Sequence, residues 1–246
     1  MDNRQSVERV VLAIELLARE GEAKLDTIAA HLGVHKSNTL RLLATLRSLG
    51  WVSRDETRSL YELGPRLITI GAAASAHLGL NEALSLAERL RDLSGESVHL
   101  AVPVEKRMLI VAKVDSLNAL RVSCHLGSED HLHSSSLGKA YLASIPDAEL
   151  DEVLSTLKLT AATVNSITSV DRLRKEIEAT RERGYSIDSE EGRIDVRCIG
   201  TTLCFGDQLI ALSITGPANR WTMENMESVI PEMLRLVEIF RCGPQR

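Results

Sequence analysis

A run of polar side chains between positions 36 and 41 has the chemistry needed to recognise a DNA duplex. Lysine and serine bind phosphate oxygens, while asparagine and arginine present paired hydrogen-bonding groups that match adenine and guanine edges in the major groove. A leucine in the same run can contact a thymine methyl group. The residues concerned are Lys36, Ser37, Asn38, Leu40 and Arg41.

Two arginines follow in a predicted β-hairpin, or wing. Trp51–Ser53 and Leu60–Leu63 alternate as short strands do, with Asp55–Thr57 turning between them. Arg54 and Arg58 at the tip can reach the sugar-phosphate backbone. Polar residues of these types also occur on ordinary surface helices, and many helix-turn-helix units contact only proteins, so that alternative stays open.

A second polar segment, His133–Ala140, follows a strand-rich region and begins a helix. Free backbone N–H groups around Ser135–Gly138 therefore make a candidate anion site. The segment is not a P-loop, because it has no glycine five residues before Gly138 and an alanine follows Lys139. A carboxylate-sized ligand fits better than a nucleotide, although serines at a helix start are most often only caps.

Other polar residues can complete a cleft over this helix start. Asp188–Glu191 is an acidic cluster, and Ser213 and Thr215 share one face of a predicted strand. Acidic clusters are usually solvated turns. Together with Ser136, however, these residues supply hydrogen-bonding groups for a small ligand.

Two chemical alternatives have weaker support. The residues that suggest a metal site are Cys124, His125, His131 and His133. Neighbouring strand residues point to opposite faces and the set lacks a recognised zinc spacing, so we expect no metal or other cofactor. A hydrolase built from Ser136, His133 and Asp188 lacks a nucleophile elbow, so we expect no catalytic residues.

The DNA-recognition residues must be positioned by helices. Apolar residues at helical spacing predict a first helix from Leu25 to Leu32, and Gly33 then provides a turn. The next helix should bury Thr39, Leu42, Leu43, Leu46 and Leu49. An earlier helix, capped by Ser6, should bury a stripe from Val7 to Ala18. Its role would be to cover the back of the other two.

The rest of the chain alternates between helical and strand patterns of the α+β kind. Residues 67–76 predict a helix of small residues that connects the two parts and helps to pair subunits; an ordinary buried helix is the alternative. Further helices are expected at 81–93, 136–145, 147–157, 170–183 and 222–240. Strands are expected at 98–102, 108–114, 120–124, 198–203 and 209–215, mostly as an antiparallel sheet.

Length and charge fit two domains with different roles. The chain has 246 residues and a net charge of −5. Residues 1–63 carry nine basic and nine acidic side chains, and within residues 34–58 five basic face two acidic ones. A local positive surface therefore survives on a chain that would not coat DNA indiscriminately.

The cysteine pattern and hydropathy suggest a cytoplasmic protein. Cys124, Cys198, Cys204 and Cys242 show no C-x-x-C spacing, which predicts reduced thiols. Apolar runs are too short for a signal peptide core or a membrane span. We expect a soluble protein that does not contact membranes.

Taken together, eight blocks in order resemble the IclR family of bacterial transcriptional regulators. They include LGVHKSNTLRLLATLRSLGWV at 32–52, SGESVHLAV at 94–102, HSSSLGKAYLA at 133–143, VRCIG at 196–200 and ALSITGP at 211–217. The resemblance implies a winged helix-turn-helix domain (1–63), a linker helix (64–80) and an effector-binding domain with a GAF-like antiparallel sheet (81–246).

The resemblance also implies which residues bind the effector. Carried onto this chain, they are Ser136, Leu137, Asp188, Cys198, Ser213 and Thr215. Departures from the family pattern at Asn38, Thr39 and Leu40 indicate a different operator, and those at His131 and Asp195 affect the shape of the cleft. The expected assembly is a homodimer or a dimer of dimers on a pseudo-palindromic DNA operator, controlled by a small organic acid. A carboxylate-processing enzyme and a ligand-sensing module that contacts only proteins are the alternatives.

Overall fold

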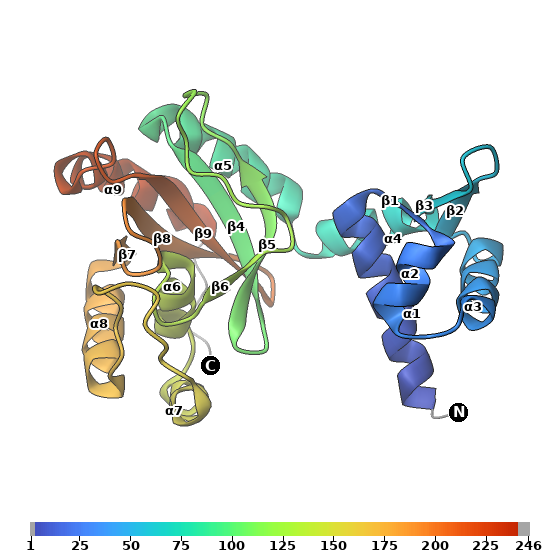
Figure 1. The fold of residues 1–246 in the computed structure, drawn as a ribbon. Helices are drawn as coiled ribbons and strands as arrows, with labels where there is room; N and C mark the ends of the chain where they lie inside the picture. Colours follow the sequence, from blue (N-terminus) through green and yellow to red (C-terminus); the bar gives the residue numbers. More distant parts are fainter. Residues whose placement is uncertain (1–2, 241–246) are drawn as a thin grey trace. The chain divides into compact units, whose positions relative to one another are not determined.

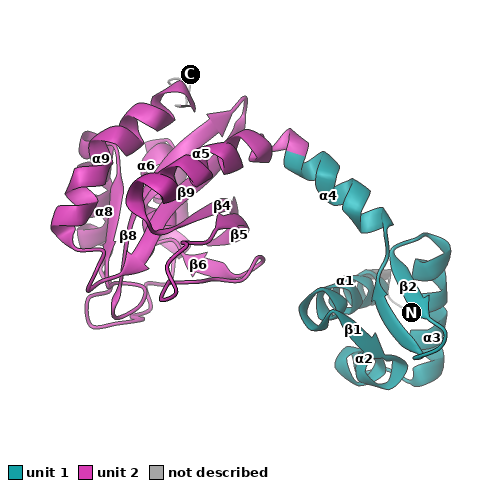
Figure 2. Ribbon diagram, turned by 90° about the horizontal axis from the view of Figure 1, so that it is seen from above, with its two compact units in different colours: residues 1–75 teal, residues 76–246 magenta. Residues whose placement is uncertain are grey.

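The computed structural model describes residues 3–240. The chain divides into two compact units, residues 1–75 and 76–246, coloured separately in Figure 2. Mixed helices and antiparallel sheet, with a helix-turn-helix unit first, confirm the predicted α+β class.

The first unit is a winged helix-turn-helix with a three-stranded sheet. Its elements are α1 (Asn3–Glu20), β1 (Glu22–Lys24), α2 (Leu25–Leu32), α3 (Lys36–Ser48), β2 (Val52–Asp55) and β3 (Leu60–Leu63). The strands lie in the order β1-β3-β2. The sequence did not predict β1, because its pairing of Ala23 with Tyr61 is a long-range contact of a strand only three residues long.

A small apolar core joins these elements. Ile28 of α2, Leu43 of α3 and Leu17 of α1 are all fully buried within it. Gly33 adopts φ 63°, the left-handed conformation that ends α2 and starts the turn. The expected N-cap at Ser6 is wrong, since α1 already includes residues 3–5, and the expected burial of Leu49 is wrong, since it is 58% exposed at the end of α3.

Helix α4 (Arg66–His77) has no buried residue among those described. Its apolar side chains Ile68 and Ile70 are exposed, and Gly71 followed by three alanines makes one stretch of its surface smooth. An apolar helix left uncovered within one chain is a surface that needs a partner.

The second unit contains one six-stranded sheet in which all neighbouring strands are antiparallel (Figure 1). The order is β6-β5-β4-β9-β8-β7. The strands are β4 (Ser97–Val104), β5 (Arg107–Val114), β6 (Glu129–His131), β7 (Ser186–Ser189), β8 (Val196–Phe205) and β9 (Gln208–Pro217). The strand expected at 120–124 is wrong: that segment is a loop, and β6 follows it.

Helices cover both faces of this sheet (Figure 1). The helices are α5 (Leu80–Ser94), α6 (Ser136–Ser144), α7 (Asp147–Thr156), α8 (Val170–Arg183) and α9 (Met223–Val237), followed by a short 3-10 turn, η1 (Glu238–Phe240). α5 and α9 pack on one face, over Leu100, Leu212 and Ile214. α6, α7 and α8 pack on the other, which is less apolar near the start of α6.

Two glycines allow α6 to approach its surroundings closely. A Cβ on Gly138 would lie 2.3 Å from the Leu132 Cα, and one on Gly200 of β8 would lie 2.9 Å from the Ser136 carbonyl carbon. Ser186 Oγ donates a hydrogen bond to the Ser136 carbonyl oxygen at 2.6 Å. The backbone of α6 therefore rests directly on the sheet.

The cysteine expectation needs a correction. Cys204 is disulfide-bonded, whereas Cys124 and Cys198 are free thiols, so the prediction that all four are reduced is wrong. Cys242 lies outside the described residues. Within residues 3–240, no helix is both long and apolar enough to cross a membrane.

Gly138→Ala is expected to lower the free energy of unfolding by about 3 kcal/mol, because the added methyl meets backbone that cannot move aside. Urea unfolding followed by circular dichroism measures the change. Gly71→Ala is the control: a Cβ there meets nothing within 4 Å, and alanine should stabilise α4 by up to about 1 kcal/mol. Equal effects of the two substitutions would contradict the close seating of α6.

Candidate functional site

The first turns of α3 present the predicted DNA-contacting residues. Lys36, Ser37, Leu40 and Arg41 are exposed and Asn38 is half-buried. Thr39, Leu43 and Leu46 are buried on the opposite face and fix the rotation of the helix. The exposed set thus forms one face, with Arg41 one turn beyond Ser37.

Acidic neighbours hold several of the basic groups. Lys36 Nζ lies 2.7 Å from Asp26 Oδ2, and Arg58 pairs with Glu22. Among the described residues, Arg41 forms no ion pair. Exposed pairs of this kind contribute only about 0–1 kcal/mol, so a phosphate can replace the acid at little cost.

The structure separates the two predicted wing arginines. Arg54 is in β2, where its guanidinium lies 5.4 Å from the Tyr61 ring centroid and its side chain is 29% exposed. Arg58 follows the turn and its side chain is 56% exposed. The turn is held by Asp55, which accepts hydrogen bonds from the backbone of Thr57 and Arg58; bonds to the Thr57 side chain and to this backbone lower the pKa of the carboxyl group. Arg58 is the more accessible of the two.

A cavity of about 340 Å³ lies in the second unit where α6 begins above the sheet. All six predicted effector residues line it: Ser136, Leu137, Asp188, Cys198, Ser213 and Thr215. Sequence analysis missed other lining residues: His99, Cys124, Asp130, Ser134 and Arg193. His131, noted there as a departure from the family pattern, also lines the cavity.

Strand register explains why residues so distant in sequence meet. Asp188 of β7 pairs with Cys198 of β8, which pairs with Thr215 of β9. Because directly opposed residues on neighbouring strands project from the same face, the three form one polar row. Ser213, two residues from Thr215, accordingly points the same way, and its Oγ lies 2.8 Å from Ser136 Oγ.

The start of α6 supplies backbone donors. Ser135 is the N-cap, and its Oγ accepts a hydrogen bond from the Gly138 N–H at 3.0 Å. The first N–H groups of a helix have no acceptor within the helix, so those of Ser136 and Leu137 are available to an anion, which the helix dipole also favours.

Asp188 gives the cavity a proton-dependent group. Its carboxylate is 4% exposed and accepts hydrogen bonds from the N–H groups of Glu191 and Gly192, at 2.7 and 3.3 Å. Burial raises its pKa to about 7, against the opposing attraction of Lys139. A protonated carboxyl can donate a hydrogen bond to a bound carboxylate, whereas the ionised form would repel it.

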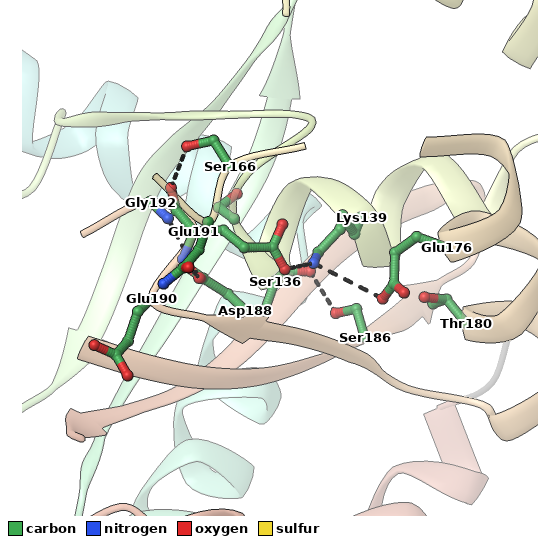
Figure 3. A network of polar contacts seen from close by, with 12 residues as sticks. Ser136, Lys139, Ser166, Glu176, Thr180, Ser186, Asp188, Glu190, Glu191 and Gly192 are labelled. Atoms are coloured by element: carbon green, nitrogen blue, oxygen red, sulfur yellow. Dashed lines mark hydrogen bonds and ion pairs between the residues drawn. The ribbon is translucent and has the colours of Figure 1, made fainter. Parts of the chain in front are cut away.

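A buried ion network fixes the loop beside Asp188 (Figure 3). Lys139 of α6 is fully buried; it pairs with Glu191 and lies 3.8 Å from Glu176 of α8. Ser166 Oγ donates to the Glu191 carbonyl oxygen at 2.6 Å. Removing one member would leave an uncompensated buried charge, so this wall of the cavity is held rigidly.

The histidines and serines are arranged unlike a metal or hydrolase site. His133 Nε2 is 3.0 Å from the Thr160 carbonyl oxygen, and His131 contacts Arg107. Ser136 Oγ has Ser213 as its partner, not a histidine. Across residues 3–240, no group of three His, Cys, Asp or Glu residues is placed to hold a metal ion.

Comparison with known proteins covers both units. Residues 6–56 match the IclR helix-turn-helix domain, and residues 73–238 match the bacterial transcriptional regulator IclR C-terminal model. The HTH-type transcriptional regulator KdgR of Dickeya chrysanthemi is 30% identical over 232 residues, which cover 93% of this chain and 76% of KdgR.

Solved structures share the fold. The IclR of Thermotoga maritima aligns with a TM-score of 0.77 and 26% identity, covering 96% of this chain and 95% of that one. An IclR homolog from Microbacterium hydrocarbonoxydans, complexed with 4-hydroxybenzoate, aligns with a TM-score of 0.80 and 21% identity, covering 95% and 98%.

The raised pKa of Asp188 predicts a pH-dependent difference between the wild type and Asp188→Asn, which keeps an acceptor for the Glu191 N–H. As pH rises from about 4 to 7, the unfolded chain loses the Asp188 proton while the folded chain retains it. The wild type should therefore lose stability relative to Asp188→Asn by about 1.4 kcal/mol per pH unit in that window. Urea unfolding at several pH values measures this, and a difference that does not vary with pH would refute the assignment.

Proposed function

The chain belongs to the IclR family of bacterial transcriptional regulators, and we propose that a small carboxylic acid controls its affinity for a specific DNA operator. The observation that carries the DNA-binding part is the single exposed face formed by Lys36, Ser37, Leu40 and Arg41 on α3. The face has the phosphate-binding and base-reading groups of a recognition helix. Such a regulator acts in the cytoplasm, where bacterial DNA lies.

Each recognition helix enters a major groove, and Arg58 at the wing contacts the backbone. Asn38 and Leu40 add an amide and an apolar contact at the base edges, while Arg54, held against Tyr61, adds positive charge. Two copies of α3 then occupy half-sites roughly 34 Å apart on a pseudo-palindromic operator.

A second copy of the chain covers α4. Ile68 is 74% exposed and Ile70 is 42% exposed, and the small residues that follow allow two helices to approach closely. Self-complementary pairing of one surface is the commonest route to a homodimer. The homodimer in turn places two recognition helices on one operator, and two homodimers can pair further.

The effector lies in the cavity at the start of α6. Its carboxylate accepts hydrogen bonds from the Ser136 and Leu137 N–H groups and from the hydroxyls of Ser213 and Thr215, while Cys198 and Asp188 close the opposite side. A carboxylate ligand in the Microbacterium hydrocarbonoxydans homolog supports this class of effector. Control of DNA binding requires that the acid prefer one arrangement of the paired DNA-binding units.

Two alternatives make different predictions. An enzyme would turn over a carboxylic acid derivative, yet Ser136 Oγ has no histidine as a hydrogen-bond partner. A module that senses ligand and contacts only proteins would show no salt-dependent affinity for DNA. The exposed basic face of α3 favours the regulator over both.

Arg41→Ala should weaken binding to a duplex from the gene's own upstream region by about 1–3 kcal/mol and relax sequence preference. Arg58→Ala should weaken operator and shuffled duplexes alike and lower the salt dependence by about one ion. Fluorescence anisotropy titrations at several salt concentrations measure both effects. Operator affinity of Arg41→Ala equal to that of the wild type would refute the assignment of α3.

Ile68→Asp should convert the homodimer into a monomer, because two carboxylates would be buried where apolar surface is expected to pair. Size-exclusion chromatography with light scattering gives the mass. Val164→Asp is the matched control, since Val164 is 94% exposed in a loop of the second unit and should leave the mass unchanged. A dimer that survives Ile68→Asp would place the pairing surface elsewhere.

A further inference from the structure

His99 lies beside the proposed carboxylate site but belongs to a different strand. It is on β4, directly opposite Ser213 of β9, and only 5% of it is exposed. Directly opposed residues in an antiparallel pair have Cβ atoms about 4.5–5.5 Å apart and share a face. Ser213 in turn contacts Ser136 at the start of α6, so the imidazole lines the same cavity one strand further along.

Two buried polar atoms of this cavity have no hydrogen-bond partner among the described residues. They are His99 Nε2 and Ser134 Oγ. Buried polar groups almost always have partners, so two unpaired atoms in one cavity point to a polar group of a ligand. A small rotation about the soft χ2 torsion of His99 turns Nε2 further toward the cavity.

The charge state of His99 limits what that group can be. Burial lowers its pKa to about 4, so the ring is neutral at physiological pH and has one N–H donor and one acceptor nitrogen. Lys113, opposite His99 on β5, is already bound to Asp115 at 3.0 Å and Ser123 at 3.1 Å. Asp130, on the β6 side, is acidic, and burial raises its pKa.

This end of the cavity therefore suits a neutral hydroxyl better than a second carboxylate. A hydroxyl can both donate and accept, which matches a neutral imidazole and a serine. A second carboxylate would face Asp130 without a free cation beside His99 to offset its charge. The volume of about 340 Å³ leaves room for a carbon skeleton between the two ends.

We infer that the effector is a hydroxy-carboxylic acid, with its carboxylate at the start of α6 and a hydroxyl bound by His99 Nε2 and Ser134 Oγ. The inference rests on the proposed function, because it assumes that the α6 end takes the carboxylate. It makes His99 and Ser134 specificity residues that distinguish hydroxylated acids from unsubstituted ones.

Calorimetric titration of the full chain with two matched pairs tests this: 4-hydroxybenzoate against benzoate, and gluconate against hexanoate. The wild type should bind the hydroxylated member of at least one pair about tenfold more tightly. In His99→Leu that ratio should fall below about threefold, while affinity for the unsubstituted acid stays the same. His125→Leu is the matched control, because His125 is exposed and does not line the cavity, and it should keep the wild-type ratio.

Equal affinities within both pairs, or a preference that survives in His99→Leu, would overturn the inference while leaving the carboxylate site intact. Absence of binding by all four acids would overturn the inference and the proposed effector class together, while operator binding would still be measurable. If His99→Leu does not fold, Ser134→Ala must lower the same ratio. An unchanged ratio in folded Ser134→Ala would then overturn the inference.

Discussion

Helix α6 can lie directly on the sheet because Gly138 and Gly200 carry no Cβ at the two points of closest approach. The contact brings the first turn of the helix onto a polar row of the sheet, where Ser136 meets Ser213. Helix N–H groups, strand hydroxyls and the Asp188 carboxyl thereby converge on one cavity. A bulkier residue at either glycine would lift the helix and separate these groups.

Holding this arrangement involves burying charge. Lys139 lies one turn along α6, fully buried against Glu191, and the same loop donates two backbone hydrogen bonds to Asp188. Buried ion pairs contribute little net stability, because desolvation offsets the attraction between the charges. Their effect here is positional, since Lys139 ties the helix start and the Asp188 loop to each other. We regard the network as the device that keeps the cavity in shape when no ligand stabilises it.

Much of this architecture could be predicted from local sequence. Helical periodicity and glycine turns located α2, α3 and α6, and the polar residues of the cavity were named before any distance was known. The failures involve long-range pairing. β1 forms only because Ala23 meets Tyr61, and His99 enters the cavity only because β4 pairs with β9. An alternating strand pattern at 98–102 marked His99 as outward from its neighbours, but no local signal says which face holds a ligand.

The two units use the same physical device for different ends. In α3 the exposed first turns present side chains to a partner, whereas in α6 the first turn presents backbone N–H groups to a cavity. Helix starts favour anions in both cases, a phosphate in one and a carboxylate in the other. A DNA-binding regulator with an acid effector follows from that pairing of sites.

The central claim is that the start of α6 holds the carboxylate, and backbone amide NMR spectra of the 15N-labelled full chain test it most directly. On titration with 4-hydroxybenzoate, the amide resonances of Ser136 and Leu137 should shift most, moving downfield as their N–H groups donate to the acid. Saturating shifts elsewhere in the chain, with these two resonances unmoved, would contradict the account.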